Sequence, residues 1–205
     1  MKVYSFCQAS LAFIIRCVFR IKVIGKENMP DHGPLMVCAN HISMWDPAVI
    51  GACLSKIQVH YMAKEELFHV PLFGRFIRAL GAYPVQRNNN DLRAIKTTIQ
   101  LLRDGNCVGI FPQGTRCRGV DPRTSTVKGG AGMCAYHAKC DILPVAVVNK
   151  KRRMTFMART FIVIGKPIPY ADLGITEGDK QQFESASRLI FDRICDLSDE
   201  YYAKL

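Results

Sequence analysis

The sequence predicts an α/β fold in which a mixed sheet is covered by helices. Short apolar and β-branched runs alternate along the chain with segments of helical periodicity, a pattern typical of a sheet packed between helices. The length of 205 residues, with 49% hydrophobic and 22% charged residues, suits one domain with a sizeable core. We therefore expect a single domain over residues 1–205, and neither a disordered chain nor a polytopic membrane protein.

The N-terminal segment, residues 1–24, is expected to hold an amphipathic helix. Its apolar residues run from Phe6 to Phe19 and lie beside Arg16, Arg20 and Lys22, so the apolar stretch is too short to span a bilayer. No small-residue cleavage site of a signal peptide is evident. The pattern fits a helix lying in the membrane interface, and an ordinary helix packed on the domain explains it equally well.

The strands of the sheet are expected where apolar or β-branched runs are bounded by Gly, Pro, Asn or Asp. These runs are residues 21–24, 35–39, 59–63, 82–85, 107–111, 142–148 and 160–164.

The helices are expected between these runs, where apolar residues recur at helical spacing. Asp46 and Pro47 resemble an N-cap and a first helical residue, which predicts a helix over 48–54. Thr176 and Asp179 resemble a capping box that opens a C-terminal helix. The remaining expected helices are 72–79, 91–103 and 131–138.

The charge of the chain predicts an anionic partner. Lys and Arg number 28 against 17 Asp and Glu, a formal net charge of +11, which favours nucleic acid, an anionic membrane surface or a phosphorylated substrate. The densest basic run, Lys150–Arg153, is short and lacks the interleaved aromatic residues of a nucleic-acid face. We interpret it as a solvated turn or a lipid-headgroup contact, and we expect no nucleic-acid partner.

The nine cysteines indicate a reducing compartment. None of them forms the Cys-x-x-Cys spacing of zinc or redox sites, and several lie inside apolar runs. We expect reduced core cysteines, no metal site, and a domain that faces the cytoplasm.

His41 and Asp46 are the candidate catalytic pair. An imidazole oriented by a carboxylate can take the proton of a hydroxyl near neutral pH. His41 is expected in the loop that precedes the helix, with Asp46 at or near the helix start, because five residues of helix would turn the two side chains apart. The spacing alone is a weak signal. In a simpler interpretation, Asp46 caps the helix and His41 is an ordinary loop residue.

Two further loops carry possible anion-binding groups. Arg87 follows an expected strand, where its planar fork suits a phosphate, although an arginine at such a position is often merely exposed. Val108–Arg116 is a strand that runs into a tight turn, whose amides beside a guanidinium suit an oxyanion or a phosphate. Lys128–Gly132 then opens a helix whose first amides add anion-binding capacity.

Together and in this order, the motifs resemble the glycerolipid acyltransferase family, which includes 1-acylglycerol-3-phosphate acyltransferases. Asn40–Asp46 is similar to its His-x4-Asp motif, Gly81–Arg87 to its Gly-x3-apolar-x-Arg motif, and Phe111–Arg116 to its Phe-Pro-Glu-Gly-Thr-Arg motif. Pro144–Val145 fits an apolar-Pro-apolar motif. The resemblance covers about residues 34–148, which we expect to form the motif-bearing core.

The resemblance implies a role for each motif. His41 would be the general base and Asp46 the residue that orients it, with no acyl-enzyme and no cofactor. The residues implied to bind or position the substrate are Arg87, Gln113, Gly114, Thr115, Arg116 and Lys128. The implied acceptor is lysophosphatidic acid, and the implied acyl donor is acyl-CoA or acyl carrier protein. We expect the enzyme at the cytoplasmic face of the membrane, peripheral or monotopic.

Two positions depart from the family pattern. Gln113 stands where the family usually has Glu, and it can position a neighbour but cannot act as a base. Cys117 stands where Ser is common, and a nucleophilic Cys117 is a minor alternative mechanism. The alternative functions are transfer to glycerol 3-phosphate or another lysophospholipid, and a non-catalytic lipid-binding role, which Gln113 favours. A basic nucleic-acid binder is a third class.

Overall fold

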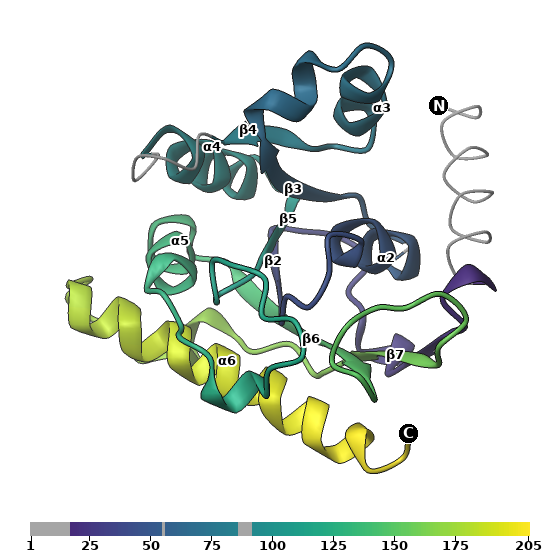
Figure 1. Cartoon of the computed structure of the whole chain (residues 1–205). Coiled ribbons are helices and arrows are strands. Elements are labelled where there is room, and N and C mark those ends of the chain that lie inside the picture. The colour runs from purple at the N-terminus through teal and green to yellow at the C-terminus, as the bar shows by residue number, and fades with distance from the viewer. Residues whose placement is uncertain (1–16, 55, 86–91) are drawn as a thin grey trace.

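The computed structural model describes residues 17–54, 56–85 and 92–205. Its centre is a seven-stranded sheet in the order β1-β7-β6-β2-β5-β3-β4 (Figure 1). The strands are β1 (Ile21–Ile24), β2 (Leu35–Ala39), β3 (Val59–Lys64), β4 (Tyr83–Val85), β5 (Cys107–Ile110), β6 (Asp141–Asn149) and β7 (Thr160–Ile164). All seven predicted strands are present, each within one residue of the expected bounds at either end.

The sheet is mixed, which confirms the predicted fold class. Strands β2 to β6 run parallel to one another, β7 is antiparallel to β6, and β1 is parallel to β7. The loops that follow β2, β3, β4, β5 and β6 therefore all lie at one edge of the sheet, which we call the carboxyl edge. Because β1 and β7 run the other way, the residues that precede them reach the same edge. Ligand sites of α/β proteins gather at such an edge.

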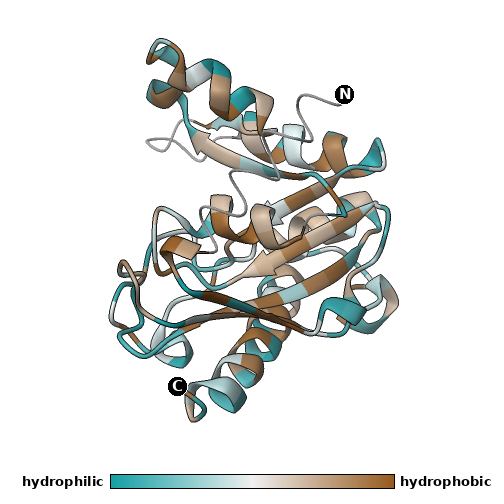
Figure 2. Cartoon of the chain, turned by 90° about the vertical axis from the view of Figure 1, so that its right-hand side faces the viewer, coloured by the Kyte–Doolittle hydropathy of each residue, from teal (hydrophilic) through white to brown (hydrophobic). Residues whose placement is uncertain are grey.

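Helices cover both faces of the sheet and complete two hydrophobic cores. The described helices are α2 (Asp46–Cys53), α3 (Phe73–Ala79), α4 (Leu92–Arg103), α5 (Gly130–Ala138) and α6 (Lys180–Tyr202). Helix α2 packs on one face, in a cluster that includes Val37 of β2, whereas α4, α5 and α6 pack on the other, in a cluster that includes Met36. Strand β2 is buried on both faces, as its continuous apolar sequence requires, and apolar residues predominate in the central strands (Figure 2).

The start of the C-terminal helix differs from the prediction. Helix α6 begins at Lys180 with Asp179 as its N-cap, and the Asp179 carboxylate accepts from the amide of Gln182 at 2.8 Å. The Gln182 side chain accepts in turn from the amides of Thr176, Glu177 and Gly178. The predicted box at Thr176 and Asp179 was wrong, because Asp179 is itself the N-cap and Gln182, three residues further on, accepts from amides that precede it.

The predicted interface helix lies largely outside the described part of the chain, which begins at Cys17. Among the residues that the structure describes, no helix has both the length and the apolar character needed to cross a bilayer.

Candidate active site

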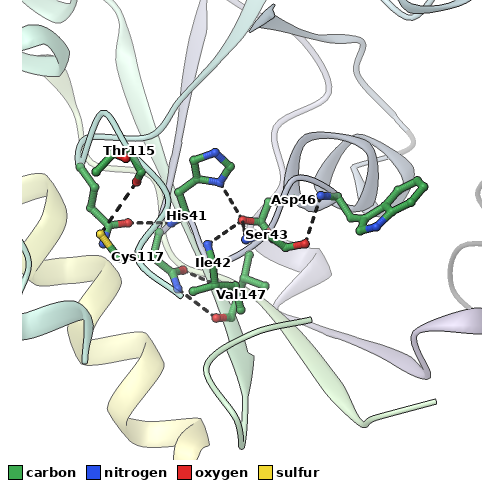
Figure 3. Close-up of polar contacts among 10 residues, drawn as sticks. His41, Ile42, Ser43, Asp46, Thr115, Cys117 and Val147 are labelled. Carbon is green, nitrogen blue, oxygen red and sulfur yellow. Dashed lines mark hydrogen bonds and ion pairs between the residues drawn. The ribbon is translucent and has the colours of Figure 1, made fainter. Parts of the chain in front are cut away.

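The loop that follows β2 is fixed to the neighbouring strand β6 by Asn40. Its side-chain amide donates to the carbonyl of Val147 at 3.0 Å, and its side-chain oxygen accepts from the Val147 amide at 2.7 Å (Figure 3). Asn40 is buried, and the two bonds act like one further rung of the sheet. The next residue, His41, therefore leaves the sheet at a fixed position and direction.

His41 and Asp46 are in direct contact, as Figure 3 shows. His41 Nδ1 lies 2.8 Å from Asp46 Oδ2, with the carboxylate buried and the histidine only 9% exposed. Because an ionised carboxylate can only accept, Nδ1 carries the proton of this bond. The lone pair of the neutral ring is then on Nε2, the nitrogen that a general base needs.

Asp46 does not cap α2 in the way expected. Helix α2 begins at Asp46 itself, with Trp45 in the N-cap position, and the Asp46 carboxylate turns back toward the preceding loop. Its Oδ2 accepts from the amides of Ile42 and Ser43, both at 2.7 Å. The N-cap prediction for Asp46 was wrong. One carboxylate oxygen instead organises the loop and orients His41, so the carboxylate has no competing bond to the helix amides.

The charge on Asp46 is held in a dry environment. Burial raises the pKa of the Asp46 carboxyl, while the bond from His41 and the amides of Ser43 and Ile42 act in the opposite direction. Its second oxygen, Oδ1, is buried and has no hydrogen-bond partner among the described residues. A buried carboxylate of this kind favours a positively charged imidazole next to it, which is the species formed when His41 takes a proton.

An aromatic stack holds the face of the His41 ring. The ring of Phe111, the residue after β5, lies 4.0 Å from the His41 ring with an interplanar angle of 15°. The Phe111 ring also stacks with the ring of Tyr61 on β3, with 5.8 Å between the two ring centroids. The stack restrains the imidazole by packing, while Asp46 restrains it by hydrogen bonding.

Gln113 supports the backbone of His41. Its side-chain oxygen accepts from the His41 amide at 2.7 Å, and its side-chain nitrogen donates to Ser125 Oγ at 2.8 Å. The Ser125 hydroxyl donates onward to the carbonyl of Pro122 at 2.6 Å. Gln113 is buried and both of its polar atoms are bonded within the protein, an arrangement that holds the His41 loop in position. Both bonds suit an amide.

The turn after Gln113 pairs with the His41 loop. Gly114 lies in the left-handed region at φ 66°, its amide donates to the Phe111 carbonyl, and the Cys117 amide donates to the His41 carbonyl at 2.8 Å. Lys128 lies against this turn, since a side chain added at Gly114 would come within 2.9 Å of Lys128 Cδ. Gly114 thus has two reasons to lack a side chain, its backbone angle and this close approach.

The chain is similar to known acyltransferases along its length. The model of a family described as acyltransferase matches residues 20–148. A 1-acyl-sn-glycerol-3-phosphate acyltransferase of Bacillus subtilis is 31% identical over 199 residues, which cover 96% of this chain and 98% of the relative. The chain belongs to the acyltransferase family. It is therefore an acyl-transferring enzyme by family, and the resemblance drawn from its motifs is confirmed.

Two more similarities support this acyltransferase assignment. A 1-acyl-sn-glycerol-3-phosphate acyltransferase of Streptococcus pneumoniae is 33% identical over 141 residues, covering 67% of this chain and 51% of the relative. The crystal structure of a 1-acyl-sn-glycerophosphate acyltransferase from Thermotoga maritima has a TM-score of 0.73 at 22% identity, covering 98% of this chain and 83% of that one. The structural similarity shows that the fold is shared.

The structure describes most of the predicted anion-binding residues of the acyltransferase, but not all of them. Thr115, Arg116 and Lys128 are exposed around the Gly114 turn, close to the His41 loop. Arg87 lies outside the described residues. At the start of α5, the Gly132 amide donates to Ser187 Oγ on α6 at 2.8 Å and is not available to a ligand.

A nucleophilic role for Cys117 is disfavoured by its surroundings. Burial raises the pKa of the Cys117 thiol, which lowers the thiolate fraction near neutral pH. Its sulfur lies 3.9 Å from the Thr115 carbonyl (Figure 3). The side chain of His41, which would have to activate the Cys117 thiol, is instead hydrogen-bonded to Asp46.

Sequence reasoning missed Ser125 and the stacked rings of Phe111 and Tyr61. Ser125 is twelve residues from Gln113 in a loop with no motif, so no local pattern marks it. Phe111 is the first residue of the motif at residues 111–116, but its contact with His41 depends on the pairing of β2 with β5.

Proposed function

We propose that this acyltransferase transfers an acyl group from an acyl thioester to the free hydroxyl of 1-acyl-sn-glycerol 3-phosphate, giving phosphatidic acid for phospholipid synthesis. The observation that carries the proposal is the buried carboxylate of Asp46 on His41 Nδ1, which leaves Nε2 as a base beside a cationic loop. The names of the relatives from B. subtilis and S. pneumoniae support this acceptor. In this proposal residues 1–205 act as one domain.

The reaction begins with the acceptor hydroxyl hydrogen-bonded to His41 Nε2. As the hydroxyl oxygen forms its bond to the thioester carbonyl carbon, its proton passes to Nε2, and Asp46 stabilises the imidazolium. The tetrahedral intermediate then breaks its carbon–sulfur bond, and the leaving thiolate takes the proton from His41. The products are the ester and a free thiol, His41 returns to its neutral form, and no acyl-enzyme is needed.

The acceptor phosphate is assigned to the cationic residues near this base. Arg116 and Lys128 supply positive charge beside the turn at Gly114 and Thr115, and Arg87 is assigned to the same phosphate from its motif. Lys128 is close to Gly114, and Arg116 forms no ion pair with an acid among the described residues. A phosphate would supply the missing countercharge.

The acyl donor and the membrane complete the proposal. The net charge of +11 suits an acidic donor, whether acyl-CoA or acyl carrier protein. The lipid acceptor supports a peripheral or monotopic position at a membrane, with the segment over residues 1–24 as the proposed interface helix. The nine cysteines without a disulfide-like pattern support the cytoplasmic face.

The experiment is to incubate the purified full chain with oleoyl-CoA and lysophosphatidic acid and to follow thiol release together with phosphatidic acid formation. Parallel reactions with glycerol 3-phosphate and lysophosphatidylcholine distinguish the acceptors, and acyl carrier protein replaces coenzyme A in a second series. We expect lysophosphatidic acid to give the highest kcat/KM. Faster transfer to another acceptor would overturn the acceptor assignment, and no thiol release with any acceptor would overturn the enzymatic proposal.

A further inference from the structure

A second basic segment lies at the carboxyl edge, outside the site described above. Residues 150–159 connect β6 to β7 and hold five Lys or Arg residues and no Asp or Glu. Phe156 and Met157 in this segment are 73% and 64% exposed, so large apolar side chains face solvent among these cations. Such a combination is typical of a surface that meets a partner rather than water.

The backbone of this segment is held in place by the rest of the fold. Arg152 forms an ion pair with Asp121 at 2.7 Å, and its carbonyl accepts from the Gly119 amide at 2.9 Å. The Met157 amide donates to the Val18 carbonyl at 2.9 Å. Arg152 and Met157 have φ angles of 48° and 60°, which side-chain-bearing residues rarely adopt without outside contacts. These contacts therefore hold the loop in a conformation in which Phe156 and Met157 are exposed.

A cavity of about 380 Å³ separates this segment from the loop that follows His41. Two of its lining residues, Arg118 and Arg153, form no ion pair with any acid in the described part of the chain, unlike the adjacent Arg152. The volume lies in the range of small-molecule sites. Two guanidinium groups without countercharge at a partly apolar cavity suit a phosphate. The lining includes Ser43, Trp45, Arg118, Arg153, Met154 and Thr155.

Aromatic contacts join this cavity to the exposed residues beside it. Phe19, just before β1, stacks on Phe156 at 5.5 Å and lies 5.9 Å from the ring of Trp45. Trp45 is itself partly exposed, next to the more exposed Met44. The cationic cavity and its apolar border therefore form one continuous surface at the end of the segment that precedes β1. We call this surface, made of Trp45, Arg118, Arg153, Phe156 and Met157, the docking rim.

We propose that the docking rim binds the membrane surface, with the phosphate headgroup of an anionic lipid held by Arg118 and Arg153. Phe156, Met157 and Trp45 enter the boundary of the acyl chains beside that headgroup. The absence of any acidic residue from the sequence of 150–159 complements a negatively charged leaflet. This inference rests on the proposed action at a membrane, and it adds a contact within the folded domain to the N-terminal segment.

The test measures binding of the full chain to vesicles of phosphatidylcholine with and without phosphatidylglycerol. Removing one cation near an anionic surface weakens partitioning about fivefold, so R118Q/R153Q is expected to bind the anionic vesicles about 25-fold more weakly. F156S/M157S is expected to bind both vesicle types more weakly, since it removes apolar contacts. Arg193→Gln is the matched control, because Arg193 is an exposed arginine on α6, and its binding should equal that of the wild type.

Transfer activity in detergent micelles, measured on the same proteins, separates the possible failures. The inference predicts that R118Q/R153Q keeps the wild-type KM for the acceptor in micelles. A raised acceptor KM there would mean that the cavity holds the acceptor phosphate, and would overturn the inference. Wild-type binding of vesicles by both rim variants would also overturn it while the proposed function stands. If the wild-type chain bound neither vesicle, both the inference and the proposed membrane location would fail.

Discussion

The two loops that meet beside His41 are built in opposite ways. In the loop at residues 40–46, Asn40, His41 and Asp46 are buried and bonded to one another or to β6. In the turn at residues 114–116, the side chains are exposed, and Arg116 has no acidic partner among the described residues. The groups proposed for proton transfer are thus pre-organised by the protein, whereas those proposed for binding await an anionic ligand.

The comparison predicts that the largest effect comes from the buried loop. Asp46→Asn is expected to lower kcat by about 1,000-fold or more with little change in the acceptor KM, because an amide no longer holds His41 in the tautomer with a free Nε2. The measurement is steady-state thiol release, with a circular dichroism spectrum to check the fold. A kcat within tenfold of the wild type would mean that the carboxylate is only structural.

The exposed turn is expected to give the opposite kinetic signature. Arg116→Gln should raise the acceptor KM by about tenfold to 100-fold, since a charge-assisted bond to phosphate contributes about 1.5–3 kcal/mol. Stability should not change, because no described residue loses an ion pair. Arg193→Gln again serves as control. An unchanged KM with a reduced kcat would remove the distinction between the two loops.

Substitutions of Gln113 test the contact between the two loops, and their effects should lie between those of the two preceding variants. Gln113→Ala is expected to reduce the free energy of unfolding by about 1–3 kcal/mol, because it leaves the His41 amide and Ser125 without partners in a buried place. Urea unfolding measures this change. Gln113→Glu keeps an acceptor for the His41 amide and should retain more activity than Gln113→Ala. An equal loss of activity in both variants would contradict a role for Gln113 as the acceptor of the hydrogen bond from the His41 amide.

The smallest expected effect is a pH dependence of stability. Because burial raises the pKa of the Asp46 carboxyl, this carboxyl binds its proton more tightly in the folded state than in the unfolded state. The difference applies at pH values between the ordinary pKa and the raised pKa. The free energy of unfolding therefore falls as pH rises through that window, with a slope of about 1.4 kcal/mol per pH unit, and then levels off. Asp46→Asn should lack this fall in urea titrations at a series of pH values. The same slope in both proteins would contradict a raised pKa for Asp46.

The sequence predicted most where the cause is local. Each strand is a short apolar run, so a pattern within one segment was sufficient to predict it. The His41–Asp46 contact spans only five residues, but its spacing is a weak signal alone and was interpreted with the help of the other motifs. The anchoring of Asn40 to Val147 joins residues 107 apart, and the stack of Phe111 on His41 needs two strands to pair. Such contacts leave no local pattern. The cap of α6 was misplaced because two acceptable capping residues, Thr176 and Asp179, stand three apart, and only the backbone decides between them.

The central claim, that His41 is the general base, is tested most directly by His41→Gln in the thiol-release assay with lysophosphatidic acid. The glutamine amide can still donate a hydrogen bond toward Asp46, but it cannot accept a proton, so the change removes the base with the least disturbance to the loop. The account predicts a fall in kcat at least as large as that of Asp46→Asn, about 1,000-fold or more, with an unchanged melting temperature. Turnover close to that of the wild type would contradict it.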